Sequence, residues 1–298
     1  MKSYPARPSR AGGGYELLDS GGGRKLERFG RYTLARPCSQ ALWEPALPPE
    51  RWRAADASFD REDGNRWHGR ANLPDEWTIE TAGIRFRLGG TDFGHLGIFP
   101  EQRAQWEWLR ATCAAARAKR PVSVLNLFAY SGGSTLACAL GGAETCHLDA
   151  SKGMVDWARA NAALNNLSSA PVRWITDDAH KFMRREIRRG RRYDGIVLDP
   201  PTFGRGAGGE MYKIERDLAE TLALARSLLS DKPLFVLFSS HTPGVSCRVA
   251  QNIIEGAFRP QAAESGEMLL DGPHAAVPCP SGVYCRAMWN EAVAACSK

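Results

Sequence analysis

The sequence predicts an α/β protein with a mostly parallel, doubly wound sheet and a small β-rich region on its N-terminal side. Two observations lead to this prediction. Short apolar runs of strand length alternate with segments of helical composition between residues 122 and 240, a pattern typical of parallel sheets covered by helices on both faces. Glycines, acids and prolines follow these runs directly, at the edge where open parallel sheets bind their ligands.

The first strand of this unit leads into a glycine turn. Val122 to Phe128 is a largely apolar run of strand length. It continues into Ala129 to Thr135, where the adjacent glycines Gly132 and Gly133 let the backbone turn tightly and let a ligand approach closely. The turn is therefore a candidate binding loop.

Acidic residues end the next two strands. Glu144 to Leu148 runs into Asp149, about twenty residues beyond the glycine turn, where doubly wound folds place the carboxylate that binds ribose hydroxyls. Val172 to Thr176 is followed by Asp177 and Asp178. Because the carboxyl ends of parallel strands share one edge, we expect the glycine turn and these acids to surround one crevice.

A fourth strand, Tyr193 to Leu198, ends in a stiff polar turn. The turn consists of Asp199, Pro200, Pro201, Thr202 and Phe203. Each proline fixes φ and removes a backbone donor. The carboxylate and the free carbonyls can accept from an amino group, and the ring of Phe203 can stack on a base. The turn therefore suits a flat polar group such as a nucleobase. The alternative is a strand-ending turn without chemistry.

The residues of the glycine turn limit the choice of cofactor. The dinucleotide fingerprint G-x-G-x-x-G is absent, and no Walker lysine follows the glycines, which disfavours a dehydrogenase and a triphosphate site. A nucleoside without a pyrophosphate fits better. S-adenosylmethionine offers a ribose diol, which Asp149 would bind, and an adenine amino group, which Asp178 would bind.

Three segments also carry a resemblance to a known family. Asn126 to Gly132, Leu148 to Ser151 and Asp199 to Phe203 resemble the class I S-adenosylmethionine-dependent methyltransferases in order and spacing. More narrowly, they are similar to the branch that contains the bacterial 23S rRNA cytosine-C5 and guanine-N7 methyltransferases. The resemblance covers roughly residues 93 to 240. It implies a Rossmann-like class I methyltransferase sheet whose last strand is antiparallel.

The resemblance also implies a set of site residues. Gly97 to Arg103 resembles the segment that enters the first helix over the methionine end of the cofactor. The residues expected to bind S-adenosylmethionine are Phe99, Gln102, Asn126, Phe128, Ala129, Tyr130, Ser131, Gly132, Gly133, Asp149, Ala150, Ser151, Asp178 and Asp199. Those expected to orient the acceptor for catalysis are Asp199, Pro200, Pro201 and Phe203.

The chemistry of the target atom separates the two relatives. A cytosine C5 becomes a nucleophile only after a cysteine adds to the neighbouring carbon, and the C5 relatives carry that thiol at the end of the next strand. This chain has Phe238, Ser239, Ser240 and His241 there. We therefore expect methylation of a base nitrogen of RNA, as on rRNA. The alternatives are a cytosine-C5 RNA methyltransferase, a methyltransferase of another substrate, and a non-catalytic protein that binds the cofactor or RNA.

Composition is that of an ordinary globular protein. The chain has 298 residues and a formal net charge of +6, which is compatible with an RNA partner. It shows no apolar run of membrane-spanning length and no apolar signal segment. Its eight scattered cysteines indicate reduced thiols in the cytoplasm and no metal site. The oligomeric state stays open, a homodimer included.

The N-terminal third is organised differently from the rest. We expect a disordered tail over residues 1–14, a hairpin-rich region over 15–98 and the methyltransferase domain over 99–298. A hairpin is predicted at 77–88, where apolar and polar residues alternate on both sides of Ala82 and Gly83. Two short strands are predicted within 15–36, whereas 36–73 shows no clear pattern.

Two basic stretches could contact RNA. Lys181 to Arg192 is dense in arginine, but its helix follows the strand ending at Asp178 and should run away from the ligand edge, which favours a solvated face. The other stretch lies in the N-terminal region and is the better candidate. Its cations are Arg24, Lys25, Arg28, Arg31 and Arg36.

Overall fold

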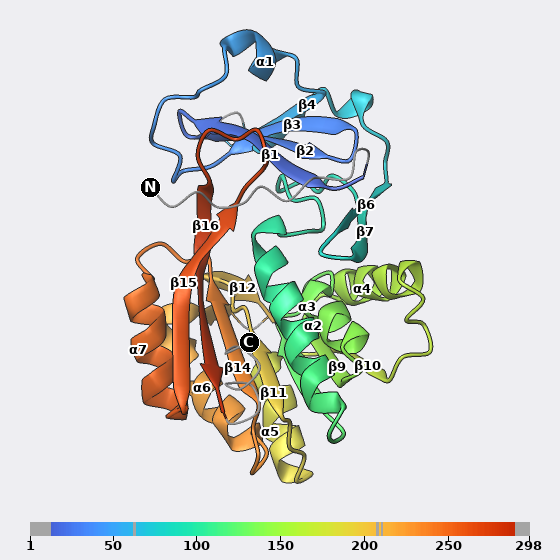
Figure 1. The fold of residues 1–298 in the computed structure, drawn as a ribbon, viewed down its shortest axis with the longest axis vertical. Helices are drawn as coiled ribbons and strands as arrows, with labels where there is room; N and C mark the ends of the chain where they lie inside the picture. Colours follow the sequence, from blue (N-terminus) through green and yellow to red (C-terminus); the bar gives the residue numbers. More distant parts are fainter. Residues whose placement is uncertain (1–12, 62–63, 207–208, 210, 290–298) are drawn as a thin grey trace. The chain divides into compact units, whose positions relative to one another are not determined.

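The computed structural model describes residues 13–61, 64–206, 209 and 211–289, and the chain divides into two compact units (Figure 1). The first unit combines the residues up to Arg103 with Leu269–Ser281. The second combines Ala104–Met268 with the residues from Gly282 onward. The sequence predicts one boundary near residue 98, so the return of 269–281 to the first unit is a feature that it does not anticipate.

The described part of the first unit is built on a five-stranded sheet with strand order β1-β2-β3-β4-β5. The strands are β1 (Tyr15–Gly21), β2 (Arg24–Phe29), β3 (Tyr32–Pro37), β4 (Ala57–Asp60) and β5 (Arg66–His68). Short helical segments are α1 (Pro49–Arg53), η1 (Arg70–Asn72) and η2 (Pro100–Gln102). The N-terminal stretch thus forms three strands rather than two, and a chain reversal at Gly30, with φ of 65°, separates the second from the third.

The predicted hairpin is confirmed as β6 (Trp77–Thr81) and β7 (Ile84–Leu88). Both turn residues, Ala82 and Gly83, have positive φ, 53° and 69°. Two-residue hairpin loops favour this combination because its twist matches that of the strands. The carbonyl of Gly13 accepts from the N–H of Glu80, so the chain is ordered from that residue on, while residues 1–12 of the expected tail lie outside the described residues.

The second unit contains the predicted doubly wound sheet. Over the described residues its strand order is β10-β9-β8-β11-β14-β16-β15. Its strands are β8 (Ser123–Leu127), β9 (Glu144–Asp149), β10 (Val172–Thr176), β11 (Gly195–Leu198), β14 (Phe235–Ser240), β15 (Ala262–Leu270) and β16 (Cys279–Met288). The pairings from β10 to β14 are parallel, and β16 pairs antiparallel to β14, as expected for the last strand.

Helices cover both faces of this sheet. They are α2 (Arg103–Arg117), α3 (Gly133–Leu140), α4 (Lys152–Leu164), α5 (Ala179–Arg188), α6 (Ile214–Leu228) and α7 (Cys247–Phe258). Successive residues of β14 point to opposite faces. Val236 belongs to the buried cluster that includes residues of α5, α6 and α7. The ring of Phe235 instead packs against that of Trp108 on α2, with ring centroids 5.3 Å apart. Alternation along one strand thus builds two apolar layers.

Two elements of the second unit are absent from the sequence prediction. One is strand β15, and the other is the short hairpin of β12 (Phe203–Arg205) and β13 (Met211–Lys213). The hairpin begins at Phe203, the last residue of the predicted acceptor segment, and therefore extends that segment.

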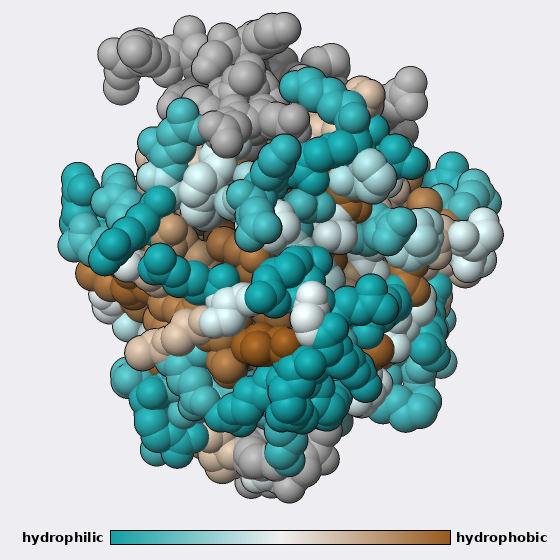
Figure 2. Space-filling model, turned by 90° about the horizontal axis from the view of Figure 1, so that it is seen from below, coloured by the Kyte–Doolittle hydropathy of each residue, from teal (hydrophilic) through white to brown (hydrophobic). Residues whose placement is uncertain are grey.

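The arginine-rich helix α5 begins at the ligand edge with Asp178 as its cap and ends at the lower end of the second unit (Figure 1). Figure 2 shows that the face seen from below is largely hydrophilic, with hydrophobic side chains in small areas. Arg184 pairs with Glu220 and Arg185 with Asp177. The helix direction is as predicted, and these pairs occupy part of its charge.

The basic residues of the first unit are also largely paired. Glu27 is buried and lies 3.3 Å from Lys25 and 2.7 Å from Arg36, atom to atom. Arg28 pairs with Glu16. Much of the charge assigned to RNA binding from the sequence therefore serves to compensate buried carboxylates.

Three further observations apply to the described residues. No helix is long and apolar enough to cross a membrane. No cluster of histidine, cysteine and acidic side chains could hold a metal ion. The described cysteines are free thiols.

Candidate cofactor and acceptor site

Four neighbouring parallel strands bring the predicted segments to one edge of the sheet. The strands β10, β9, β8 and β11 lie side by side in that order. Their carboxyl ends are followed by Asp177 and Asp178, by Asp149, by the turn from Phe128, and by Asp199. The prediction that these strand ends share an edge is confirmed.

The turn after β8, which we call the β8 loop (residues 128–133), holds an uncommon backbone conformation. Phe128 and Tyr130 have φ of 56° and 50°, a region in which residues with side chains are strained. Between them, the N–H of Ala129 donates to the carbonyl of Leu148 on β9 at 3.0 Å. Such strain persists only where surrounding contacts enforce it and is typical of binding sites.

Asp149 connects the β8 loop to the start of α4. Its Oδ2 accepts from the N–H of Tyr130 at 2.8 Å, and its Oδ1 accepts from the N–H of Ser151 at 2.8 Å. Burial raises the pKa of Asp149, and the two hydrogen bonds oppose that rise. Since a carboxylate has about four acceptor positions, capacity remains for hydroxyl donors of a ligand.

The two glycines of the loop have a packing role. A Cβ atom on Gly132 would lie 2.9 Å from the Cβ of Ala158 on α4, and one on Gly133 would lie 2.6 Å from the ring of Trp106 on α2. The sequence predicts close approach of a ligand here. The structure adds that the close approach of two helices also requires the absence of side chains at these positions.

Two of the predicted cofactor residues make contacts within the interior. Asn126 donates through Nδ2 to Thr135 Oγ1 at 2.8 Å, and the same oxygen lies 2.9 Å from Nδ1 of His147. The carbonyl of Ser131 accepts from Nδ2 of Asn161 at 2.9 Å. These contacts hold the loop in place from the sheet and α4. Direct contact of Asn126 or Ser131 with a cofactor stays a prediction.

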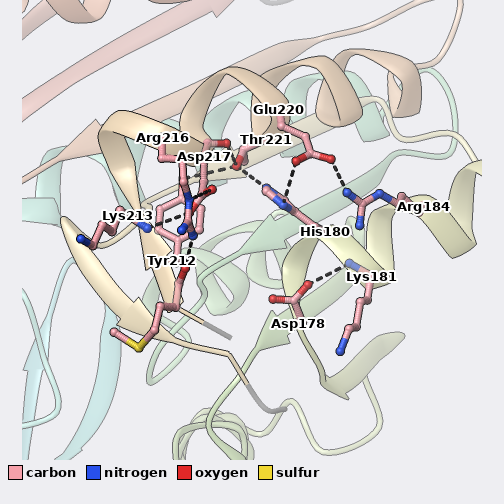
Figure 3. Close-up of polar contacts among 11 residues, drawn as sticks. Asp178, His180, Lys181, Arg184, Tyr212, Lys213, Arg216, Asp217, Glu220 and Thr221 are labelled. Atoms are coloured by element: carbon pink, nitrogen blue, oxygen red, sulfur yellow. Dashed lines mark hydrogen bonds and ion pairs between the residues drawn. The ribbon is translucent and has the colours of Figure 1, made fainter. Parts of the chain in front are cut away.

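Helix caps lie at the same edge. Ser151, preceded by Ala150, caps α4, where its Oγ accepts from the N–H of Met154 at 3.4 Å. Asp178 caps α5, where its Oδ1 accepts from the N–H of Lys181 at 2.9 Å (Figure 3). The cap places the Asp178 carboxylate at the ligand edge, as an adenine-binding role requires, although that role itself stays a prediction.

The acceptor segment is tied to the end of the neighbouring strand β14. Asp199 Oδ1 lies 3.7 Å from Nδ1 of His241, the residue after β14. The hydroxyls of Thr202 and Thr242 are 2.8 Å apart. Pro200 between these contacts is buried. The turn is therefore held from two sides, which suits a group that must orient an acceptor.

Phe203 is presented outward by the β12–β13 hairpin. Its residue surface is 55% exposed, and the Nζ of Lys213 on the opposite strand lies 5.9 Å from the ring centroid. At the start of the hairpin, Gly204 packs closely against the ring of Pro201. A Cβ atom at this position would lie 3.0 Å from that ring. An exposed ring next to a cation is the combination that stacks a base and attracts a phosphate.

Sequence reasoning did not anticipate the contacts of three residues that support the hairpin. The ring of Tyr212 on β13 packs at a tilt against that of Phe128, with centroids 5.3 Å apart, and its hydroxyl lies 3.3 Å from Thr221 Oγ1 on α6. His180 Nε2 on α5 reaches the same threonine at 2.7 Å (Figure 3). No motif signals these contacts, because each joins elements distant in sequence.

Phe99 and Gln102 belong to the first unit. The Phe99 ring centroid lies 5.6 Å from that of His95, and Gln102 is buried at the end of η2, directly before α2. Their predicted contact with the methionine end of the cofactor stays a prediction.

The fold and the strand-end residues define the class of doubly wound α/β proteins that bind a nucleoside cofactor. Within it, the chain belongs to the S-adenosylmethionine-dependent methyltransferase family, whose profile matches residues 45–232. A solved S-adenosylmethionine-dependent methyltransferase from Agrobacterium tumefaciens is similar with a TM-score of 0.87 and 36% identity, covering 97% of this chain and 98% of that one.

Curated relatives are named as ribosomal RNA methyltransferases. Ribosomal RNA large subunit methyltransferase K/L of Syntrophotalea carbinolica is 37% identical over 147 residues, which are 49% of this chain and 19% of the relative. Ribosomal RNA large subunit methyltransferase I of Tolumonas auensis is 29% identical over 226 residues, which are 74% of this chain and 55% of the relative. The chain thus spans about a fifth of the first relative and about half of the second.

The residues present fit the cofactor that the family uses. The ribose of S-adenosylmethionine needs a carboxylate with spare acceptor capacity, which Asp149 has. Its adenine amino group needs an acceptor, which Asp178 can supply at the end of β10. The strained β8 loop lies between these acids and the acceptor segment in strand order.

Proposed function

We propose that the protein methylates a base nitrogen of RNA, with ribosomal RNA as the favoured substrate and S-adenosylmethionine as methyl donor. The observation that carries the proposal is the adjacency of β9, β8 and β11, whose ends bear Asp149, the β8 loop and Asp199-Pro200-Pro201. The names of the curated relatives support RNA as the substrate class. A cytoplasmic location and a homodimer keep the status of sequence-based expectations.

The chain's own residues have mainly positioning tasks. When bound, S-adenosylmethionine supplies a methyl group on a positively charged sulfur, and its transfer requires an acceptor atom placed in line. Asp199 and the carbonyls of the proline turn would bind the edge of the target base, and Phe203 would stack on a base. Lys213 would attract the phosphate backbone.

A nitrogen target is favoured over cytosine C5 because the described residues directly after β14 include no cysteine. The segment after β14 is Ser240-His241-Thr242. Cys285, which pairs with Phe238 in the sheet, is buried, and burial raises the pKa of its thiol to about 12. A thiol with that pKa is protonated at neutral pH and is not a nucleophile.

Calorimetry with S-adenosylhomocysteine tests the cofactor site. Asp149→Asn should weaken binding by roughly 10- to 100-fold, because hydrogen bonds to a charged group contribute about 1.5–3 kcal/mol. Asp156→Asn is the matched control, since Asp156 lies on α4 and pairs with Lys152 and Arg159 at the surface. Equal affinities of wild type and Asp149→Asn would remove the central assignment.

Mass mapping of modified nucleosides tests the acceptor. Ribosomal RNA from cells with and without the gene should differ by one methylated base, and the site should be restored by wild type but not by Asp199→Ala. A methyl group on carbon 5 of cytosine would overturn the nitrogen assignment. Methyl incorporation into protein or small molecules alone would overturn the RNA assignment.

A further inference from the structure

We propose that Tyr212 is a positioning residue that couples occupancy of the cofactor site to the placement of the β12–β13 hairpin, which we call the acceptor hairpin. The inference rests on the proposed function and deepens it, because it identifies how the two halves of the site act together.

The contacts of Tyr212 reach both sides of the cofactor site. Tyr212 lies on β13, paired opposite Gly204 and between Met211 and Lys213, in the hairpin that presents Phe203. Its ring lies 5.3 Å from Phe128 of the β8 loop and 6.1 Å from His180, which is two residues beyond Asp178 on α5. One side chain of the acceptor hairpin thus touches the segments that would hold the ribose side and the adenine side of the cofactor.

On the opposite side, the Tyr212 hydroxyl makes a long contact with the hydroxyl group of Thr221 (Figure 3). Thr221 is buried, and its Oγ1 donates its hydrogen to the carbonyl of Asp217 at 2.9 Å. The same oxygen therefore accepts from Nε2–H of His180 at 2.7 Å and from the hydroxyl of Tyr212 at 3.3 Å. Burial raises the pKa of Tyr212 to about 12, so the phenol stays a donor at neutral pH.

The base of the hairpin is anchored separately from its contact with the β8 loop. The N–H of Lys213 donates to Asp217 Oδ2 at 2.7 Å, and the N–H of Ile214 donates to the carbonyl of Thr202 at 3.1 Å. These bonds connect the base of the hairpin to the start of α6 and to Thr202, and neither involves the β8 loop. The ring of Tyr212 instead contacts Phe128, whose backbone is strained and whose loop is expected to contact the cofactor.

Thermodynamic linkage gives this arrangement a consequence. If cofactor binding fixes the β8 loop, the Phe128 ring is held in place. Its contact with Tyr212 then favours the position of the hairpin that the structure shows. Binding of an acceptor to Phe203 and Lys213 must then strengthen cofactor binding by the same factor. Couplings of this kind are about 5- to 150-fold.

Hydrogen exchange of backbone amides tests the proposal without turnover. Addition of saturating S-adenosylhomocysteine should slow exchange at 203–205 and 211–213 about fivefold or more in wild type. Tyr212→Ala should lose this effect in the hairpin and keep the ligand-induced protection at 129–132 and 149–151. Tyr212→Phe retains the ring contact and should behave like wild type, which a role of the hydroxyl alone would not allow.

Failure of the inference and failure of the proposed function give different patterns. Protection at 129–132 and 149–151 without any change in the hairpin of wild type would overturn the inference and leave the cofactor site intact. Hairpin protection that persists in Tyr212→Ala would also overturn it. Absence of protection in all segments of wild type would overturn both. If Tyr212→Ala fails to fold, Phe128→Leu removes the same ring contact from the other side and should give the same loss in the hairpin.

Discussion

Thr135 joins three elements through one buried hydroxyl group. Asn126 on β8 and His147 on β9 are register partners in the sheet, and both reach Thr135 on α3. The Thr135 oxygen accepts from the Asn126 amide and shares a hydrogen bond with Nδ1 of His147. The arrangement connects the sheet to the helix that follows the β8 loop.

Removing this hydroxyl should be costly. Thr135→Val leaves the Asn126 amide and His147 Nδ1 without their buried partner, and we expect the free energy of unfolding to fall by about 2–3 kcal/mol. Chemical denaturation measures the change. Thr145→Val is the control, because Thr145 is also buried and makes one long bond of 3.3 Å to the carbonyl of Ala143; its loss should be about 1 kcal/mol or less. Equal losses would contradict the shared role of Thr135.

His147 should give the stability a characteristic dependence on pH. Burial, with a smaller contribution from the positive charge of Arg159, lowers the pKa of His147 to about 3 in the folded protein. The unfolded chain titrates near about 6.5. Between these values the unfolded state binds a proton that the folded state does not, so stability falls as pH decreases from about 6.5 towards 3 and is unaffected above 6.5.

At pH 5 we expect His147 to lower the free energy of unfolding by about 2 kcal/mol relative to pH 7. Denaturant titrations at the two pH values should therefore show a smaller difference for His147→Gln than for wild type, by about that amount. Parallel behaviour of the two proteins would show that His147 is accessible to protons in the folded state.

The types and order of the site residues could be predicted at this scale, whereas their contacts could not. Asp149 and Asp199 stand out because acids after apolar strands have few structural reasons to be there. The inward role of Asn126 is invisible in the sequence, since an amide within a strand fits either a ligand or a buried partner such as Thr135. Only the tertiary contacts decide between them.

Helix packing at the β8 loop explains why α3 begins with a glycine. Gly133 is the first residue of α3 and faces Trp106 of α2. A side chain there would force α2 or the loop to move. The approach of these helices brings the loop into the position that the site requires.

Two glycine substitutions should therefore have opposite effects. Gly133→Ala places a Cβ 2.6 Å from the Trp106 ring, and we expect a loss of about 1–3 kcal/mol in unfolding free energy. Gly153→Ala in α4 places a Cβ 3.8 Å from Ser151 Oγ, an ordinary contact distance, and should gain about 0.5 kcal/mol from the better helix former. Thermal unfolding of both variants is the measurement. A stabilising Gly133→Ala would show that α2 adjusts freely.

Periodicity predicted the long elements well and the short ones poorly. The strands β8 and β11 were recognised because each buries a largely apolar run, whereas β9 and β10 were recognised although they are more polar and β10 is only partly buried. The hairpin of β12 and β13 has three residues per strand and lies within a glycine-rich segment, so its sequence resembles a loop. Strand β15 contains Glu264, Gly266 and Glu267, which obscure its alternation.

At the scale of the whole molecule, the chain crosses between its units three times. After residue 268 it contributes Leu269–Ser281 to the first unit and then returns to the second. This segment is integral to the first unit: the N–H of Leu17 donates to the carbonyl of Asp271 at 2.9 Å, and Leu270 and Cys279 are buried. A boundary search along the sequence cannot detect such a return.

Residues 1–103 alone should therefore not fold to a stable unit. Without 269–281 they expose the apolar surface that Leu270 and Cys279 cover. We expect 1–103 to bind a hydrophobic dye and to melt without cooperativity. The same residues joined to 269–281 by a glycine–serine linker should melt cooperatively and bind little dye. Cooperative melting of 1–103 by itself would contradict this expectation.

The late return of the chain has a consequence for biosynthesis. The ribosome adds Leu269 about 165 residues after Arg103. At a synthesis rate of about 5–20 residues per second, this is a delay of roughly 10–30 s. During this interval the nascent N-terminal unit lacks a segment of its own interior. The second unit also awaits β16, which is made last among the described strands. Neither unit can be completed before residues 269–288 have been synthesised, so the first unit stays incomplete while most of the second is being made.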